Sequence, residues 1–224
     1  HGIEPVFCGN PLADDIAERK ATLPTRDKFL MDNILNDKPI VAMLAGSRLS
    51  EINANLPDMV AIARRFPDYQ FVVTAVRWID IKNYERLTNG VANVKIVVDR
   101  TQETLAMADA AIVCSGTATL ETALMRIPEV VLYHVPWLYE KLKPYFLRIP
   151  YVSLVNINLG REAVRELVKA RLDVDEAAEE LRGILPGGAK RESMLRDFEE
   201  LSTMIGDEGA SDRFACDIVK TLQR

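Results

Sequence analysis

The sequence has few of the residues that bind metals or form disulfides. Its 224 residues include two histidines and three cysteines, Cys8, Cys114 and Cys216. An odd number of widely spaced cysteines does not form a disulfide framework, and we interpret them as free thiols in a reducing compartment. No HExxH or paired CxxC pattern appears, so we predict no metal site and no cofactor.

The sequence also lacks long apolar runs and an excess of basic residues. No run approaches the ~20 apolar residues of a membrane-spanning helix, and no signal peptide is recognisable, so we expect a cytoplasmic location. The formal net charge is -5, whereas nucleic-acid binders usually carry a basic excess, so we expect no nucleic-acid partner. The chain begins at His1 without an initiator Met, which we interpret as a processed or shortened chain.

Short apolar runs alternate along the chain with segments whose apolar residues recur at helical spacing. Strands are expected at residues 40–44, 71–73, 94–98, 110–114 and 129–133. Helices are expected at residues 51–66, from 101 to 108, and after Gly116. This alternation predicts an α/β fold, a Rossmann-like doubly wound parallel sheet with right-handed crossovers. Ligands of such sheets bind beyond the carboxyl ends of the strands, which directs attention to the loops at Gly46 and Gly116.

The pattern changes after Pro150. Residues 164–169 are predicted to form one or two helical turns, followed by helices at 175–184, 192–205 and 211–222. Ser211 is the expected N-cap of the last helix. We therefore predict a single domain over residues 1–224, with an α/β core at about 1–155 and a helical region at about 156–224.

The first candidate site is the loop after the strand at 40–44. Gly46 permits close backbone approach, Ser47 offers a hydroxyl, and Arg48 offers a fork of donors that suits phosphate oxygens. A helix that starts near Ser50 adds the positive end of its dipole. The alternative is a plain turn with a solvated Arg48, and the pattern does not decide between the two.

The second candidate site follows the strand at 110–114. Small residues crowd the start of a helix, where N–H groups and hydroxyls suit a pyrophosphate. Glu121 lies one turn inside this helix, and a carboxylate there can accept hydrogen bonds from a ribose diol. The alternative is an ordinary helix start with a surface Glu, and the pattern moderately favours the anion site.

Two further stretches carry polar or aromatic clusters. In Tyr151–Asn156, Asn156 is placed to read a base edge or a sugar, although the pattern alone favours an ordinary loop. Residues 136–148 interleave aromatic and basic side chains, which suits either peripheral membrane contact or core aromatics with solvated lysines. The second interpretation is favoured; the candidates for membrane contact are Trp137, Lys141, Lys143, Tyr145 and Phe146.

Several stretches, taken in order, resemble the lipid-A-disaccharide synthases. Ser115–Glu121 reads SGTATLE and matches that family's motif outright. Leu44–Ile52 resembles LPGSRxxEI with Ala45 for Pro, and Tyr151–Ile157 resembles YVSLPNI with Val155 for Pro. The remaining resemblances are Gly9–Asp14 to GHPLxD, with Asn10 for His; Gly160–Glu162 to GRE; and Glu166–Lys169 to ELLQ, with Lys169 for Gln.

The resemblance implies the C-terminal, donor-binding half of a GT-B glycosyltransferase that needs no metal. The implied reaction transfers 2,3-diacylglucosamine from UDP-2,3-diacylglucosamine to 2,3-diacylglucosamine 1-phosphate with inversion, and releases UDP. The acceptor domain and the general base are expected on an N-terminal half absent from this chain, so we expect no transferase activity from the chain alone. The donor-binding residues implied are Gly46, Ser47, Arg48, Glu51, Ser115, Gly116, Thr117, Thr119, Glu121, Asn156, Arg161 and Glu166.

Two other functions remain open at this point. One is a non-catalytic module that binds a nucleotide sugar or docks on the inner membrane. The other is a domain of a related UDP-sugar transferase or epimerase, against which the combination of SGTATLE and the YVSL-type stretch argues.

Overall fold

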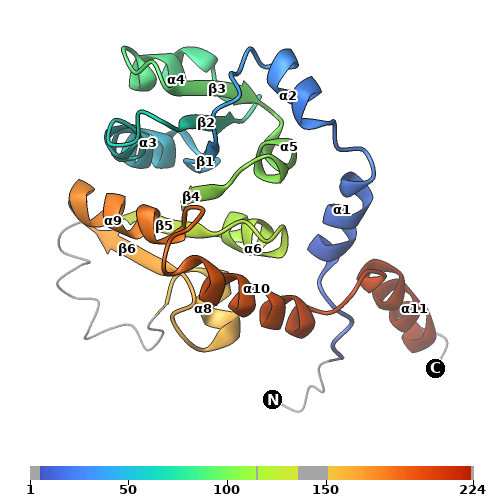
Figure 1. Ribbon diagram of the computed structural model, residues 1–224. Coiled ribbons are helices and arrows are strands. Elements are labelled where there is room, and N and C mark those ends of the chain that lie inside the picture. Colours follow the sequence, from blue (N-terminus) through green and yellow to red (C-terminus); the bar gives the residue numbers. More distant parts are fainter. Residues whose placement is uncertain (1–5, 115, 136–150, 223–224) are drawn as a thin grey trace.

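A six-stranded parallel sheet forms the centre of the computed structural model, which describes residues 6–114, 116–135 and 151–222. The strands lie in the order β3-β2-β1-β4-β5-β6 (Figure 1). β1, β2, β4 and most of β5 are buried, because helices cover both faces, and this explains their continuous apolar sequences. The strands are β1 Ile40–Leu44, β2 Gln70–Ala75, β3 Val94–Val98, β4 Ala110–Cys114, β5 Glu129–His134 and β6 Arg165–Lys169.

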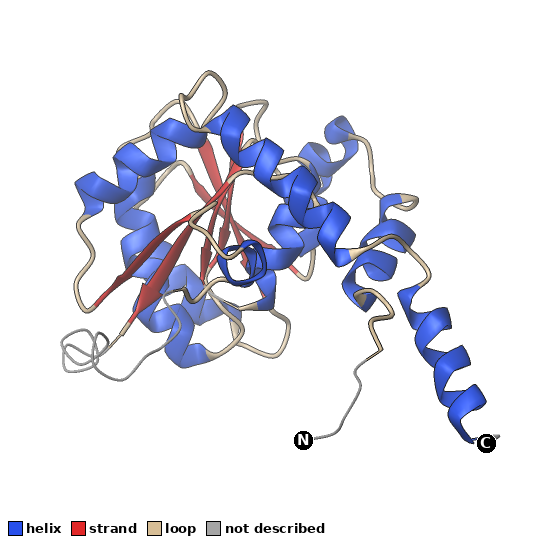
Figure 2. Ribbon diagram, turned by 90° about the horizontal axis from the view of Figure 1, so that it is seen from below, coloured by secondary structure: helices blue, strands red, loops and turns tan. Residues whose placement is uncertain are grey.

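Helices lie on both sides of the strands, as Figure 2 shows. The helix α3 packs with α4 and α9, while α6 packs with α1, α8 and α10. The predicted doubly wound α/β fold with C-terminal helices is thereby confirmed. The helices are α1 Pro11–Lys20, α2 Arg26–Asp32, α3 Leu49–Ala63, α4 Ile81–Thr88, α5 Thr101–Ala106, α6 Thr117–Leu124, α8 Leu154–Leu159, α9 Val174–Ile184, α10 Arg191–Ile205 and α11 Ala210–Leu222.

The strand order reverses between β1 and β4. The chain runs outward from β1 through β2 to β3 and then returns to the centre, where β4 pairs with the other side of β1. The loops that follow β1 and β4 therefore diverge at the carboxyl edge of the sheet. This is the switch point at which doubly wound sheets bind ligands.

The C-terminal region differs from its prediction in two places. Residues 165–169 form the edge strand β6, paired with β5, and are not helical turns. The stretch at 151–156, where the pattern alone favours an ordinary loop, leads into the helix α8, whose N-cap is Ser153 and whose end is Gly160 in the left-handed conformation. Short segments of this kind take their structure from distant partners, here β5, which local periodicity does not reveal.

The last helix is capped from outside its own sequence. α11 begins at Ala210, so Ser211 lies inside the helix and the prediction of Ser211 as its N-cap is wrong. The carboxylate of Asp14 on α1 accepts hydrogen bonds from the N–H groups of Gly209, Ala210 and Ser211. Hydrogen bonds from Ser211, Gly209 and Ala210 lower the pKa of Asp14 to about 2. α1 and the start of α11 are thereby joined beside the sheet (Figure 1).

Candidate functional site

A cleft of about 350 Å³ opens at the switch point, where the first and second candidate loops meet. Residues 40–51 and 110–121 are distant in sequence but adjacent here, because β1 pairs with β4. The lining residues are Leu44, Gly46, Ser47, Arg48, Glu51, Thr74, Val76, Thr101, Cys114, Gly116, Thr117, Ala118 and Glu121.

The loop after β1 is held by its own carboxylate. Glu51 Oε2 accepts hydrogen bonds from the N–H groups of Ser47 at 2.9 Å and Arg48 at 3.2 Å. Gly46 has φ of +112°, and a Cβ there would lie 2.6 Å from the Glu51 Cβ, so the position requires glycine. Glu51 therefore occupies two of the N–H groups that precede α3.

Arg48 supplies the positive charge of this wall. Its side chain is 79% exposed and contacts Glu51 Oε1 through Nη1 at 2.9 Å. An exposed ion pair of this kind is worth little, so the guanidinium can leave Glu51 for an anion in the cleft at small cost. Glu51 thus shapes the loop, and Arg48 provides the cation.

The loop after β4 leaves its backbone open to the cleft. Gly116 is the N-cap of α6 and has φ of +119°, and no atom of the described residues lies within 4 Å of the position that a Cβ would take. Gly116 and Thr117 are both exposed, so the first turn of α6 faces the cleft with N–H groups that have no partner within the helix. Ser115 lies outside the described residues.

Thr119 points away from the cleft. Its hydroxyl is buried, donates to the Gly116 carbonyl at 2.8 Å and accepts from the Leu154 N–H at 3.3 Å. Thr119 is therefore a bridge between α6 and α8, and its predicted contact with the donor is not met in this structure.

Glu121 lies one turn into α6, as predicted, and lines the cleft. Its Oε1 accepts a hydrogen bond of 2.8 Å from the Gln102 side-chain amide. Burial raises the pKa of Glu121, the hydrogen bond from Gln102 opposes this, and the nearby charge of Asp15 raises it further while Arg19 lowers it. The carboxylate stands beside the open end of α6, where it can accept hydrogen bonds from a diol.

The turn at 151–166 does not reach the cleft. Asn156 is fully buried; its Oδ1 accepts from the N–H groups of Ala163 and Val164, and its Nδ2 donates to the Val164 carbonyl and to Glu166. Glu166 in turn accepts from the N–H groups of Val152 and Ser153. In this structure the polar atoms of Asn156 and Glu166 are bonded within the protein and lie away from the cleft, so their predicted roles in donor binding stay predictions.

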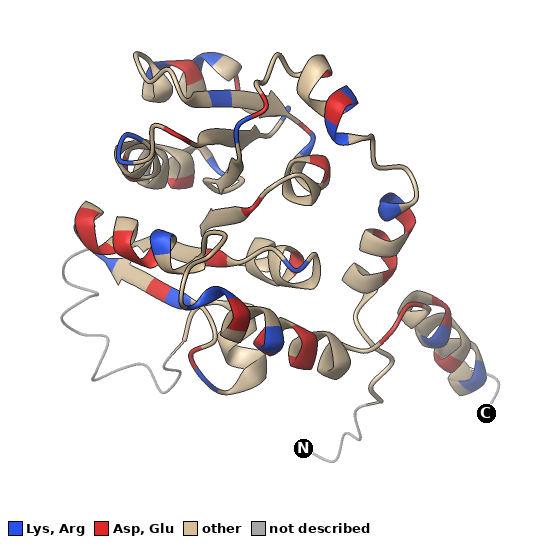
Figure 3. Ribbon diagram, viewed as in Figure 1, with Lys and Arg blue, Asp and Glu red and all other residues tan. Residues whose placement is uncertain are grey.

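Arg161 forms ion pairs away from the cleft. Its guanidinium lies 2.7 Å from Asp197 and 2.5 Å from Glu200, both on α10, and these carboxylates raise its pKa. Basic and acidic residues are interspersed along α10 (Figure 3). Arg161 is not among the residues that line the switch-point cleft, so the structure does not support its predicted donor contact.

Sequence reasoning missed residues from β2 and α5 at this site. Thr74 and Val76 line the cleft because β2 lies next to β1, and Thr101 lines it from the start of α5. Trp78 is 67% exposed, and its indole N–H donates to the Ser47 carbonyl at 3.1 Å. Finding these residues from the sequence would have required the strand order, which local patterns do not give.

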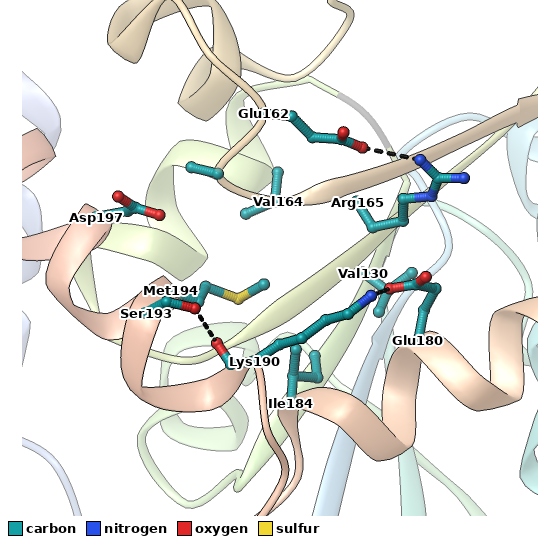
Figure 4. Close-up of a pocket in the computed structure, with 11 residues that line it drawn as sticks. Val130, Glu162, Val164, Arg165, Glu180, Ile184, Lys190, Ser193, Met194 and Asp197 are labelled. Carbon is teal, nitrogen blue, oxygen red and sulfur yellow. Dashed lines mark hydrogen bonds and ion pairs between the residues drawn. The ribbon is translucent and has the colours of Figure 1, made fainter.

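A second cavity lies near the amino ends of β5 and β6 and is drawn in Figure 4. It has a volume of about 270 Å³ between α9, α10 and residues 162–165. Its charged side chains are paired: Arg165 with Glu162, Lys190 with Glu180, and Asp197 with Arg161, which lies outside the cavity lining. Because these charges are mutually neutralised, the cleft at the switch point is the better candidate site.

Comparison with known proteins decides the family. The lipid-A-disaccharide synthetase family matches residues 1–212. The chain belongs to this family. The lipid-A-disaccharide synthase of Myxococcus xanthus is 33% identical over 99% of the chain, and that of Thiobacillus denitrificans is 33% identical over 99%. The chain covers 58% and 60% of these two relatives, so it spans a little over half of their length.

Solved structures agree with the lipid-A-disaccharide synthetase assignment at the level of fold. WaaG, a glycosyltransferase involved in lipopolysaccharide biosynthesis, aligns with a TM-score of 0.54 and 14% identity over 80% of this chain and 46% of its own. UDP-GlcNAc 2-epimerase from Neisseria meningitidis, bound to UDP-GlcNAc, aligns with a TM-score of 0.60 and 14% identity over 95% of this chain and 54% of its own. The fold therefore resembles one half of a GT-B glycosyltransferase or epimerase.

The predictions about metals and membranes can be compared with the described residues only. Among these residues, no group of His, Cys, Asp and Glu is arranged to hold a metal ion. No helix in the same part of the chain has the length and apolar character to cross a membrane. The aromatic and basic stretch at 136–148, a candidate for membrane contact, lies outside the described residues.

Proposed function

We propose that the switch-point cleft binds the nucleoside diphosphate of UDP-2,3-diacylglucosamine, the donor of lipid-A-disaccharide synthesis. The observation that carries this proposal is the meeting of three chemical groups in one cleft. The open N-terminus of α6, the exposed guanidinium of Arg48 and the carboxylate of Glu121 all line it. These suit, respectively, phosphate oxygens, a second phosphate charge and a ribose diol.

In this proposal the pyrophosphate lies against the N–H groups and hydroxyls of residues 115–117. Arg48 leaves Glu51 to contact a phosphate or the uracil, and Glu121 accepts from the ribose hydroxyls. Departure of UDP develops negative charge, which the helix start and Arg48 stabilise by preorganised hydrogen bonding. Thr119, Asn156, Arg161 and Glu166 have no place in donor binding here, because their polar groups are used elsewhere.

The whole protein would transfer 2,3-diacylglucosamine to 2,3-diacylglucosamine 1-phosphate at the cytoplasmic side of the inner membrane. Displacement requires both substrates to be held together. We therefore propose that the acceptor site and the general base belong to the part of the relatives that this chain does not span. Membership of the family favours this function over that of a non-catalytic module or an epimerase, because the relatives compared above are named as lipid-A-disaccharide synthases.

Isothermal titration of UDP into the 224-residue chain tests the proposal. Glu121→Ala removes charge-assisted hydrogen bonds and should cost about 1.5–3 kcal/mol, or roughly 10- to 150-fold in affinity. Arg48→Ala should weaken UDP binding by a similar factor. Arg126→Ala is a matched control, because Arg126 is exposed and paired with Glu199 outside the cleft. Tight UDP binding that neither cleft variant weakens would show that the site is misplaced.

A further inference from the structure

Gln102, in the first turn of α5, joins three elements beside the cleft. Its Nε2 donates to Glu121 Oε1 on α6 and to Asp15 Oδ2 on α1, each at 2.8 Å. The side chain is largely buried, with 8% of the residue exposed. A carboxamide nitrogen carries two hydrogens, so the two carboxylates use its full donor capacity.

This arrangement fixes one oxygen of Glu121 and leaves the other available. Within the described residues, no protein group donates to Glu121 Oε2, while Oε1 is held by Gln102. The carboxylates of Asp15 and Glu121 would repel one another, and the Gln102 amide between them satisfies both. Asp15 is also paired with Arg19 at 3.1 Å on its own helix, so it has a second partner whereas Glu121 has one.

We propose that Gln102 is a positioning residue. It orients the Glu121 carboxylate so that Oε2 of Glu121 accepts a hydrogen bond from the ribose 2′-hydroxyl of the nucleotide. This inference rests on the proposed function, since it requires a ribonucleotide in the cleft. A partly buried carboxylate with no fixed partner would rotate or take up a proton. The hydrogen bond from Gln102 opposes the increase in pKa that burial causes in Glu121, and so favours the accepting, ionised form.

Selectivity between UDP and 2′-deoxy-UDP measures this role directly. The unmodified chain should bind UDP about 10-fold more tightly than 2′-deoxy-UDP, a difference in binding free energy of about 1.4 kcal/mol. Gln102→Met keeps the length of the side chain and removes its donors, so the preference should fall below about 3-fold. Gln102→Leu serves the same purpose if the Met variant does not fold, which thermal unfolding of each variant establishes.

Asp15→Ala separates positioning from packing. It removes the α1 arm of the bridge but keeps the bond from Gln102 to Glu121, so the 10-fold preference should persist. A folded Gln102 variant that retains the full preference overturns the inference. Loss of the preference in Asp15→Ala to the same extent also overturns it, because the effect would then pass through α1.

Binding of the two nucleotides by the unmodified chain distinguishes a failure of this inference from a failure of the proposed function. If the unmodified chain binds neither nucleotide, the proposed function fails, and this inference fails with it. If it binds both nucleotides equally, the site stands, but the assignment of Glu121 to the ribose and of Gln102 to its orientation are both wrong.

Discussion

In the cleft between β1 and β4, polar groups face solvent, whereas in the segment at 151–166, which contains α8, the polar side chains are bonded inside the protein. Gly116 and Thr117 are exposed, and nothing lies within 4 Å of the position that a Cβ at Gly116 would take. Asn156 and Ser153 are fully buried and hydrogen-bonded to neighbouring backbone. Both regions carry a stretch that resembles the same family, yet only one has atoms to offer to a ligand.

The difference lies in whether each polar group finds a partner within the chain. At the turn, an amide and a carboxylate satisfy the backbone of two loops, which stabilises the connection between α8 and β6. At the cleft, Gly46 and Gly116 adopt backbone conformations that favour glycine, and among the described residues no side chain caps the start of α6. A family motif can therefore preserve a fold as readily as a site.

Asn156→Ala should have the largest effect on stability. It leaves the Ala163 and Val164 N–H groups and the Val164 carbonyl without partners, at about 1 kcal/mol or more each. The expected loss of about 3 kcal/mol should lower the thermal midpoint by about 6–12 °C. Asn158→Ala, on the exposed side of the same helix, is the control and should stay within about 0.5 kcal/mol.

The same variant sharpens the comparison with the cleft. UDP affinity, measured by titration at a temperature where Asn156→Ala is folded, should match that of the unmodified chain. A large fall in affinity without a fall in the thermal midpoint would place Asn156 in the nucleotide site after all.

Glu129→Gln should have an intermediate effect that depends on pH. Glu129 is fully buried and no protein group bonds to its carboxyl among the described residues; burial, and then the charge of Glu166, raise its pKa well above 4.5. A raised folded pKa means that stability is fully present below the unfolded pKa and is lost as pH rises toward the folded one. The Gln variant lacks this loss.

Thermal unfolding between pH 5 and pH 8 checks this prediction. The midpoint of Glu129→Gln relative to the unmodified chain should increase steadily as the pH rises through this interval. Glu162→Gln, at an exposed position, should show no such trend. A difference that is constant with pH would mean that Glu129 does not retain its proton in the folded protein.

Arg161→Ala should have the smallest effect. Its ion pairs with α10 involve side chains that are partly exposed and screened by solvent, so their loss should change the thermal midpoint little. UDP affinity should not change, in contrast to Arg48→Ala, and parallel titrations of the two variants decide this. Weakened UDP binding by Arg161→Ala would return this residue to the donor site.

Much of the sheet was predictable because its strands carry their own signal. Residues 40–44 and 110–114 are apolar throughout, as strands buried on both faces must be, and their predicted bounds match those of β1 and β4. β6 was not predictable, because Arg165–Lys169 reads RELVK, which has no regular alternation of polar and apolar residues and spans only five positions at the edge of the sheet. Its conformation depends on hydrogen bonds to β5 that no local pattern encodes.

The site was predictable only in part. The glycines at 46 and 116, with Arg48 and Glu121, could be identified because each residue type has a chemistry suited to a nucleotide. Gln102 could not be identified in this way, because a Gln in a helix is ordinarily a surface residue with no particular suitability for a nucleotide. Its role emerges only because α1, α5 and α6 meet around it.

The sequence by itself determined the alternation of strands and helices, the family, and the residue types available at the end of each strand. These follow from local periodicity, glycine conformations and side-chain chemistry, which act over a few residues. Only the tertiary structure decided which polar groups remain available to a ligand. In it, Asn156 is buried and bonded to nearby backbone, Glu51 is bonded to the backbone of its own loop, and Glu121 lies beside Gln102. Whether a polar group binds a ligand depends on whether the folded chain has already given it a partner, and side-chain periodicity does not reveal those partners.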